Sequence, residues 1–160
     1  LHDFHAFTPT VANIRPTSRG EISISSSDTK VNPKIKMNYL STDEDRKVAS
    51  DGIKLIRKIV METNEFKKYE PEEFRPGSHL NDKEEIVKAC SHYAQTIFHP
   101  VGTCKMGNDD SAVVSDKLKV HGLNKLRVID ASIMPNITSG NTNAPTIMIA
   151  EKGADMILSP

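Results

Sequence analysis

The sequence predicts a domain of the α+β class, and three observations support this prediction. Strand and helix patterns are both present in the 160 residues, but they do not alternate in the regular way that builds a parallel sheet covered by helices. Strand patterns dominate the first forty residues, whereas later segments are mostly helical. The chain contains no Gly-x-Gly-x-x-Gly stretch, so it lacks a dinucleotide-binding βαβ opening of its own.

Three extended segments are predicted before the first helix. Residues 4–14 combine β-branched and aromatic side chains around one proline, which suits an edge strand or a bulge. Residues 15–20 are rich in turn-forming residues, and residues 21–25 then alternate as a half-buried strand does. Residues 33–40 form the third extended segment.

A long helix follows these strands. Ser41 or Thr42 can cap it, and acidic residues occupy its first turn. Its apolar residues recur at helical spacing: Val48, Ile53, Leu55, Ile56, Ile59 and Val60. Residues 63–80 carry several charges, two prolines and a glycine, which predicts a surface loop.

Two further helices and two extended segments are predicted in the second half. Asn81 or Asp82 begins a shorter helix that continues through Cys90. Residues 94–98 are extended, and residues 126–130 are expected to form a buried strand that ends in an acidic residue. The last helix covers about residues 144–158, and its pattern predicts one apolar face made of Ile147, Ala150, Ala154 and Ile157.

Composition excludes several kinds of protein. Lysine plus arginine equals aspartate plus glutamate at 21 each, so no basic field is available to attract nucleic acid. No apolar run approaches the roughly 20 residues that span a bilayer. Cys90 and Cys104 lack metal-ligand spacing with the histidines and are expected to be free thiols. These features favour a cytoplasmic or peripherally membrane-associated protein without fixing its compartment.

His99 is the first candidate for a catalytic residue. It ends an extended segment and precedes Pro100 and Gly102, a position that can present an imidazole at the edge of a cleft. Histidine titrates near neutral pH and therefore suits general base catalysis. A loop histidine without a role is the alternative explanation, and the local sequence alone favours it.

Asn141 is the second candidate. It lies in a polar stretch directly before the last helix, and Pro145 fits the first turn of that helix. The positive end of the helix dipole could face an anionic ligand. Plain helix capping is the alternative explanation.

Three longer stretches, taken together and in this order, are more specific than either candidate alone: His99–Gly107, Leu126–Pro135 and Ser139–Lys152. They resemble the C-terminal region of the glucose–methanol–choline (GMC) oxidoreductase family, and the nearest likeness is to its choline dehydrogenase-like alcohol dehydrogenases. Residues 15–20 and 38–41 also resemble segments of this family's substrate domain. The resemblance covers nearly the whole chain.

The resemblance implies a division into two parts and a flavin cofactor. Residues 1–98 would belong to a substrate-binding domain built on a mixed sheet, and residues 99–160 would form the catalytic loop and the segment that returns to the FAD-binding domain. FAD would be held mainly by an N-terminal portion of the same protein. The chain begins at Leu1 without a start methionine and is expected to be part of a longer protein, so alone it would be inactive.

The resemblance also assigns an activity, in which an alcohol is oxidised to an aldehyde or ketone. His99 would accept the proton of the alcohol, Asn141 would stabilise the developing alkoxide, and the hydride would pass to flavin N5. Oxygen or a quinone-like carrier would then reoxidise the flavin. A hydroxynitrile lyase on the same fold, or a non-catalytic fragment, are the alternatives.

Four further residues are implied to approach the cofactor. Thr142 and Asn143 lie at the start of the last helix, whose positive end would face the flavin. Asp130 and Ala131 match positions near the pyrophosphate and ribityl portion. Because a carboxylate would repel a pyrophosphate, backbone N–H contacts are expected there, with the Asp130 side chain directed elsewhere.

Overall fold

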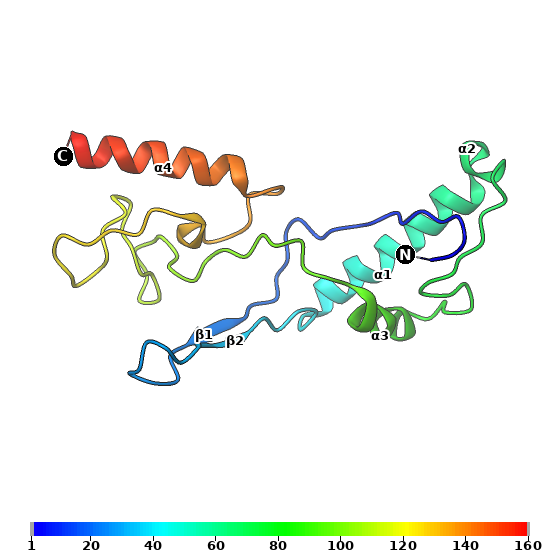
Figure 1. Cartoon of the computed structure of the whole chain (residues 1–160), viewed down its shortest axis with the longest axis horizontal. Helices are drawn as coiled ribbons and strands as arrows, with labels where there is room; N and C mark the ends of the chain where they lie inside the picture. The colour runs from blue at the N-terminus through cyan, green and yellow to red at the C-terminus, as the bar shows by residue number, and fades with distance from the viewer. Residues whose placement is uncertain (1, 160) are drawn as a thin grey trace. The chain divides into compact units, whose positions relative to one another are not determined.

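The computed structural model describes residues 2–159 and confirms the predicted α+β class. Its elements are β1 (Glu21–Ser23), β2 (Lys34–Lys36), α1 (Asp43–Glu62), α2 (Asn64–Lys67), α3 (Lys83–Tyr93), the short 3-10 helix η1 (Ala131–Ile133) and α4 (Asn143–Leu158) (Figure 1). The chain forms two compact units. The first contains residues 2–13, 17–19 and 38–95, and the second contains residues 14–16, 20–37 and 96–159. Residues 1 and 160, which close the two predicted domain ranges, lie outside the described residues.

The sheet is smaller than the mixed sheet that the resemblance implied. β1 and β2 form one antiparallel pair, in which Ile22 faces Ile35. Both strands lie inside the segments predicted to be extended, but they are shorter and fully exposed, and Ile22 is 52% accessible. The prediction of a half-buried strand is therefore wrong for this chain. Gly20 is required beside the pair, because a Cβ there would lie 2.2 Å from the carbonyl oxygen of Lys36.

Residues 4–14 do not form the predicted strand. The segment has no regular structure, and two of its apolar side chains, Phe7 and Val11, contact helices of the first unit instead. Phe7 stacks on Phe66 of α2 with ring centroids 5.7 Å apart. Val11 lies against Gly52 of α1, where an added Cβ would come within 2.9 Å of the valine methyl groups. β-branched and aromatic residues thus serve a helix contact here, because no strand partner is paired with them.

The start of α1 follows from its capping residues. Thr42, rather than Ser41, is the N-cap, and its hydroxyl accepts a hydrogen bond from the backbone N–H of Asp45 at 3.3 Å. Four of the predicted apolar residues (Val48, Ile53, Ile56 and Val60) are half-buried, whereas Leu55 and Ile59 are exposed. The predicted helix is thereby confirmed, with a narrower apolar face than the sequence suggested.

A buried carboxylate ties the segment before β1 to α1. Asp45 is only 5% accessible, and its side chain accepts hydrogen bonds from the backbone N–H groups of Thr17 (2.8 Å) and Ser18 (2.9 Å) and from the amide of Asn13 (3.2 Å). Burial tends to raise the pKa of Asp45, but the hydrogen bonds from Ser18 and Thr17 outweigh it and hold the pKa below its usual value. The ionised form therefore stabilises the folded state.

Replacing Asp45 by asparagine is expected to lower the free energy of unfolding by about 1–3 kcal/mol at pH 7, because an amide cannot accept from all of these donors. A group whose folded-state pKa is depressed contributes stability above its unfolded pKa and loses it as the pH falls. The difference between wild type and Asp45→Asn in urea unfolding should therefore be smaller at pH 3 than at pH 7. The control is Asp51→Asn in the same helix. The exposed Asp51 carboxylate pairs with Lys47, and its removal should change the free energy of unfolding little. Equal effects of the two variants would contradict the assignment.

The segment predicted to be a surface loop is more ordered than expected. The short helix α2 occupies its beginning, so the prediction of a loop throughout 63–80 is wrong. Arg57 of α1 holds the remainder by pairing with Glu73 through two 2.9 Å hydrogen bonds and by donating to the carbonyl oxygens of Gly77 and Leu80. Long-range hydrogen bonds of this kind leave no periodic signal in the sequence.

The helix α3 begins where the sequence predicts and continues further. Asp82, not Asn81, is the N-cap, and its carboxylate accepts from the backbone N–H of Glu84 at 2.8 Å. The helix extends beyond Cys90 to Tyr93 and contacts α1 within the first unit (Figure 1). The segment 94–98 that follows has no regular structure and is exposed.

The second unit is built mainly from loops around a small apolar core. Its buried residues are Val114, Leu118, Ile133, Met134 and Ile149. Residues 126–130 do not form the predicted strand: a single bridge pairs Arg127 with Lys119, and the N–H of Val128 donates to the carbonyl oxygen of Leu118 at 3.2 Å. Backbone N–H and C=O groups of these loops are paired through single hydrogen bonds rather than through a continuous β-ladder.

The last helix, α4, is confirmed, and the side that packs on the core is not the apolar face named from the sequence. Ile149 and Gly153 are the buried residues, whereas Ile147 (55%) and Ile157 (54%) are largely exposed in the described chain. The reason is the close approach at Gly153, where a Cβ would lie 2.5 Å from a methyl carbon of Ile129. A small residue, which a hydrophobicity pattern ignores, therefore determines the contact face.

Gly153→Ala is expected to destabilise the protein by about 1–3 kcal/mol through overpacking against Ile129. In an Ile129→Ala background the same change should become neutral or stabilising, because alanine has a higher helix propensity than glycine by about 1 kcal/mol. Urea unfolding of the four proteins in this double-mutant cycle measures the coupling. An identical effect of Gly153→Ala in both backgrounds would show that this contact does not limit the approach of α4.

Candidate active site

His99 lies half-buried at the end of the exposed segment 94–98. The residue before it, Phe98, has a left-handed backbone with φ of +61°, which non-glycine residues rarely adopt. A sharp change of chain direction thus directly precedes the imidazole. Such strained residues cluster at functional sites.

The loop after His99 is held in place by the backbone around η1. Gly102 has φ of +89°, a conformation that favours glycine. The N–H of Cys104 donates to the carbonyl oxygen of Ser132 at 3.1 Å, and the N–H of Met106 donates to that of Ile133 at 2.8 Å. The stretches 99–107 and 126–135, which the sequence singled out separately, are therefore bonded to each other.

The structure brings His99 and Asn141 together although they are 42 residues apart. Nε2 of His99 lies 3.2 Å from Oδ1 of Asn141, and Nδ1 lies 2.9 Å from Oγ1 of Thr142. Both ring nitrogens of the imidazole thus have a polar partner from the segment that begins α4. The arrangement can fix the orientation of the ring and leaves Asn141 exposed toward solvent.

Thr142 and Asn143 stand at the N-terminus of α4. Thr142 is the N-cap residue by position, but its hydroxyl makes no capping bond, since it contacts His99 instead. Its carbonyl oxygen accepts hydrogen bonds from the N–H and the hydroxyl of Thr146, at 3.0 and 2.6 Å. Asn143 is the exposed first residue of the helix. The positive end of the α4 dipole is therefore next to the His99–Asn141 pair.

Asp130 uses its carboxylate within its own turn. Oδ1 accepts hydrogen bonds from the N–H (2.8 Å) and the hydroxyl (2.5 Å) of Ser132, so Asp130 caps the short helix η1. Ala131 is the first residue of that helix. Contacts of the backbone N–H groups of Asp130 and Ala131 with a cofactor remain a prediction.

The two cysteines are both free and half-buried. Burial raises the pKa of the Cys90 thiol, which disfavours the reactive thiolate. Within residues 2–159, no group of three or more histidine, cysteine, aspartate or glutamate residues is placed to hold a metal ion. No helix in this part of the chain is long and apolar enough to cross a membrane.

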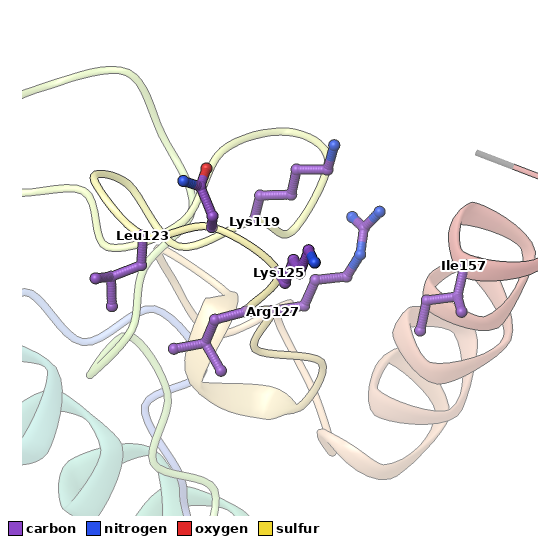
Figure 2. Close-up of a pocket in the computed structure, with 7 residues that line it drawn as sticks. Lys119, Leu123, Lys125, Arg127 and Ile157 are labelled. Atoms are coloured by element: carbon purple, nitrogen blue, oxygen red, sulfur yellow. The ribbon is translucent and has the colours of Figure 1, made fainter.

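An open hollow also lies in the second unit, between the loop 119–127 and the end of α4 (Figure 2). Lys119, Lys125 and Arg127 surround its apolar lining, to which Ile157 of α4 contributes. Arg127 links the two elements, because its guanidinium donates to the carbonyl oxygens of Lys117 and Met156. None of the predicted site residues lines this hollow, so it is separate from the His99 pair.

Sequence reasoning missed the hydrogen bond between Thr142 and His99. The available signal was a hydroxyl residue directly after Asn141 and before a helix, which suggested capping of that helix or approach to a cofactor. An N-cap side chain that makes no capping hydrogen bond can bond to another residue instead. Only the fold shows which residue that is.

Comparison with known proteins is consistent with this architecture. A family model described as GMC oxidoreductase matches residues 16–150. An oxygen-dependent choline dehydrogenase from Proteus mirabilis is 46% identical over 155 residues, which cover 97% of this chain and 28% of that protein. A protein of the same name from Pseudomonas fluorescens is 44% identical over 153 residues and is matched over 27% of its length. The chain thus spans little more than a quarter of these relatives.

Solved structures show the same likeness. Pyridoxine 4-oxidase from Mesorbium loti matches with a TM-score of 0.85 and 35% identity, over 92% of this chain and 28% of that one. A fungal aryl-alcohol oxidase matches with a TM-score of 0.82 and 29% identity, over 91% of this chain and 24% of that one. The formate oxidase of Aspergillus oryzae, studied for modification of its FAD, has a TM-score of 0.80 at 33% identity, over 96% of this chain and 28% of that one.

These comparisons confirm the predicted resemblance. The family model covers most of the chain, and FAD is the cofactor of the family. Both His99 and Asn141, which is close to the start of α4, lie within the matched range. This chain belongs to the GMC oxidoreductase family.

Proposed function

We propose that the protein containing this chain oxidises an alcohol to an aldehyde or ketone with FAD, and that His99 and Asn141 carry out the proton chemistry. The observation that supports this most directly is the pairing of the His99 imidazole with Asn141 and Thr142. A histidine held by two polar partners at the start of a helix suits a general base.

Within this proposal, His99 Nε2 accepts the proton of the substrate hydroxyl. The Asn141 side chain donates its amide N–H to the alkoxide oxygen as negative charge develops, a role typically worth about 3–4 kcal/mol. Both side chains come from segments anchored on η1 and α4, which keeps them in fixed positions. FAD, when bound, supplies the hydride acceptor.

The same segment offers a suitable surface for the flavin. The N-terminus of the 16-residue helix α4 lies next to His99, and backbone N–H groups at a helix start attract negative charge. We assign Thr142 and Asn143 to this contact, and the backbone of Asp130 and Ala131 to the pyrophosphate and ribityl portion. By the same proposal, residues 1–98 belong to the substrate domain and residues 99–160 complete the FAD-binding domain.

The substrate class is proposed from the relatives. Proteins named oxygen-dependent choline dehydrogenase are 44–46% identical to this chain, so choline-like alcohols are the first candidates. The matched structures include a pyridoxine oxidase and an aryl-alcohol oxidase, which extends the set to other primary alcohols. Oxygen or a quinone-like carrier completes the cycle as electron acceptor.

Anaerobic reduction of the flavin in the full-length protein tests the activity. Choline, pyridoxine and benzyl alcohol are mixed in turn with the oxidised protein, and the loss of flavin absorbance is followed. Choline is expected to bleach the flavin fastest. A flavin that stays oxidised with every alcohol would contradict the proposal, and release of cyanide from a cyanohydrin without bleaching would identify a hydroxynitrile lyase instead.

The isolated 160-residue chain is expected to bind no flavin and to be inactive. It holds only part of the proposed flavin contacts, and the chain has no glycine-rich phosphate-binding turn of its own. The absorbance spectrum of the purified chain after incubation with FAD and removal of unbound cofactor measures this. Stoichiometric flavin absorbance would show that these residues are sufficient for binding.

A further inference from the structure

The hydroxyl of Thr142 lies within hydrogen-bond distance of one ring nitrogen of His99. Thr142 is 8% accessible, and its Oγ1 lies 2.9 Å from Nδ1 of His99. Although Thr142 is the N-cap residue of α4, its side chain makes no capping hydrogen bond. A residue type that normally caps a helix is thus used to contact the imidazole.

We propose that Thr142 is a positioning residue: its hydroxyl holds the His99 imidazole at Nδ1 and accepts the Nδ1 hydrogen when Nε2 is free to take the substrate proton. This inference rests on the proposed function, in which His99 is the base. Thr142 does not itself touch the reacting atoms in this role; it acts through the imidazole.

The chemistry of a neutral imidazole explains why a partner at Nδ1 matters. One ring nitrogen carries a hydrogen and the other a lone pair. The Asn141 carbonyl oxygen, 3.2 Å from Nε2, stabilises the tautomer with hydrogen on Nε2, which cannot act as a base at that atom. The competent tautomer has its hydrogen on Nδ1, and Thr142 Oγ1 is positioned to accept it.

A hydroxyl suits both states because it donates and accepts hydrogen bonds. It can donate to Nδ1 while Nε2–H bonds to Asn141, and it can accept from Nδ1–H once a substrate hydroxyl replaces the Asn141 carbonyl. After proton transfer both ring nitrogens carry hydrogen, and Oγ1 still accepts from Nδ1. Thr142 therefore also stabilises the protonated imidazole formed in the reaction.

The surroundings of Thr142 keep this hydroxyl in place. Its carbonyl oxygen accepts from the N–H of Thr146 at 3.0 Å and from the Thr146 hydroxyl at 2.6 Å. Two hydrogen bonds of the first turn of α4 therefore fix its backbone. A β-branched side chain has few accessible rotamers, so Oγ1 has little freedom to leave Nδ1.

A pair of substitutions separates the hydroxyl from the shape of the side chain. Thr142→Val keeps the branched shape and removes the hydroxyl, whereas Thr142→Ser keeps the hydroxyl. In the full-length protein with FAD, Thr142→Val should slow anaerobic flavin reduction by choline about tenfold or more. Thr142→Ser should restore the rate to within about threefold of wild type.

Nitrogen-15 shifts of the histidine rings provide a readout that is independent of turnover. The His99 signals are assigned by their loss in His99→Gln. At high pH, where the ring is neutral, Thr142→Val should change the separation of the two ring shifts, and Thr142→Ser should not. If Thr142→Val does not fold or loses its FAD, Thr142→Ala serves as the second hydroxyl-free variant.

The outcomes keep the two proposals apart. If the wild-type protein reduces its flavin but Thr142→Val matches wild type in rate and ring shifts, the inference about Thr142 is wrong and the proposed function stands. If no alcohol reduces the wild-type flavin, the proposed function is wrong, and the ring shifts alone still decide whether the Thr142 hydroxyl holds the imidazole at Nδ1. Equal losses in Thr142→Val and Thr142→Ser would indicate a packing role and overturn the inference.

Discussion

Replacing His99 by alanine in the full-length protein should lower the rate of flavin reduction by about 100- to 10,000-fold, the range in which general base catalysis usually contributes. The alcohol would then have to lose its proton to water, which is held in no defined position. Stopped-flow reduction of the flavin under anaerobic conditions measures this step without the later reaction with the electron acceptor. The flavin content and the unfolding temperature should remain those of wild type, since the ring is half-buried and at the surface of its unit.

A second histidine provides the matched control for that experiment. His121 also lies in the second unit, is exposed, and hydrogen-bonds through Nε2 to the carbonyl oxygen of Gly107 at 3.0 Å. His121→Ala should leave flavin reduction within about twofold of wild type, because a surface substitution away from special features usually has a small effect. A loss of less than tenfold in His99→Ala, or an equal loss in both variants, would remove His99 as the base.

Replacing Asn141 by leucine should slow flavin reduction by about 100- to 1,000-fold, the usual effect of removing one donor to a developing oxyanion. Leucine has nearly the shape of asparagine but can neither donate nor accept a hydrogen bond. The affinity for the alcohol should change less than the rate, because the interaction strengthens as charge develops on the oxygen. Flavin reduction at several alcohol concentrations separates the two quantities.

The control for Asn141 is an asparagine in the same unit with no proposed role. Asn124 is exposed on the loop that lines the hollow of Figure 2, and Asn124→Leu should retain the wild-type rate within about twofold. If Asn141→Leu raised only the alcohol concentration needed for half-maximal rate, Asn141 would bind the substrate without stabilising the alkoxide.

Helix boundaries were predictable because their signals are local. Thr42 and Asp82 were each one of two predicted caps, and each accepts a hydrogen bond from the backbone within its own first turn. The short-range pattern of apolar and polar residues then marked α1, α3 and α4. Such elements depend on residues three or four positions apart, which any reading of the sequence includes.

Strands and contact faces were predicted less well because their partners are distant in the sequence. Residues 4–14 and 126–130 have the composition of strands, but no continuous partner is paired with either in the described chain. The side of α4 that packs on the core differs from the apolar face named from the sequence, for a related reason. The close approach of Ile129 to Gly153 selects the packed side of the helix. The apolar pattern of α4 carries no information about the side chain of Ile129 that it packs against.

The sequence by itself determined the family, the α+β class and the main helices, and it named His99 and Asn141 as candidate site residues. Only the tertiary structure decided that the two residues lie together. It also decided that the Thr142 hydroxyl bonds to His99 instead of capping α4. A hydrogen bond between residues 43 positions apart exists only when two loops and a helix start are anchored on the same core. Residue identity limits which bonds are possible, and the fold selects among them.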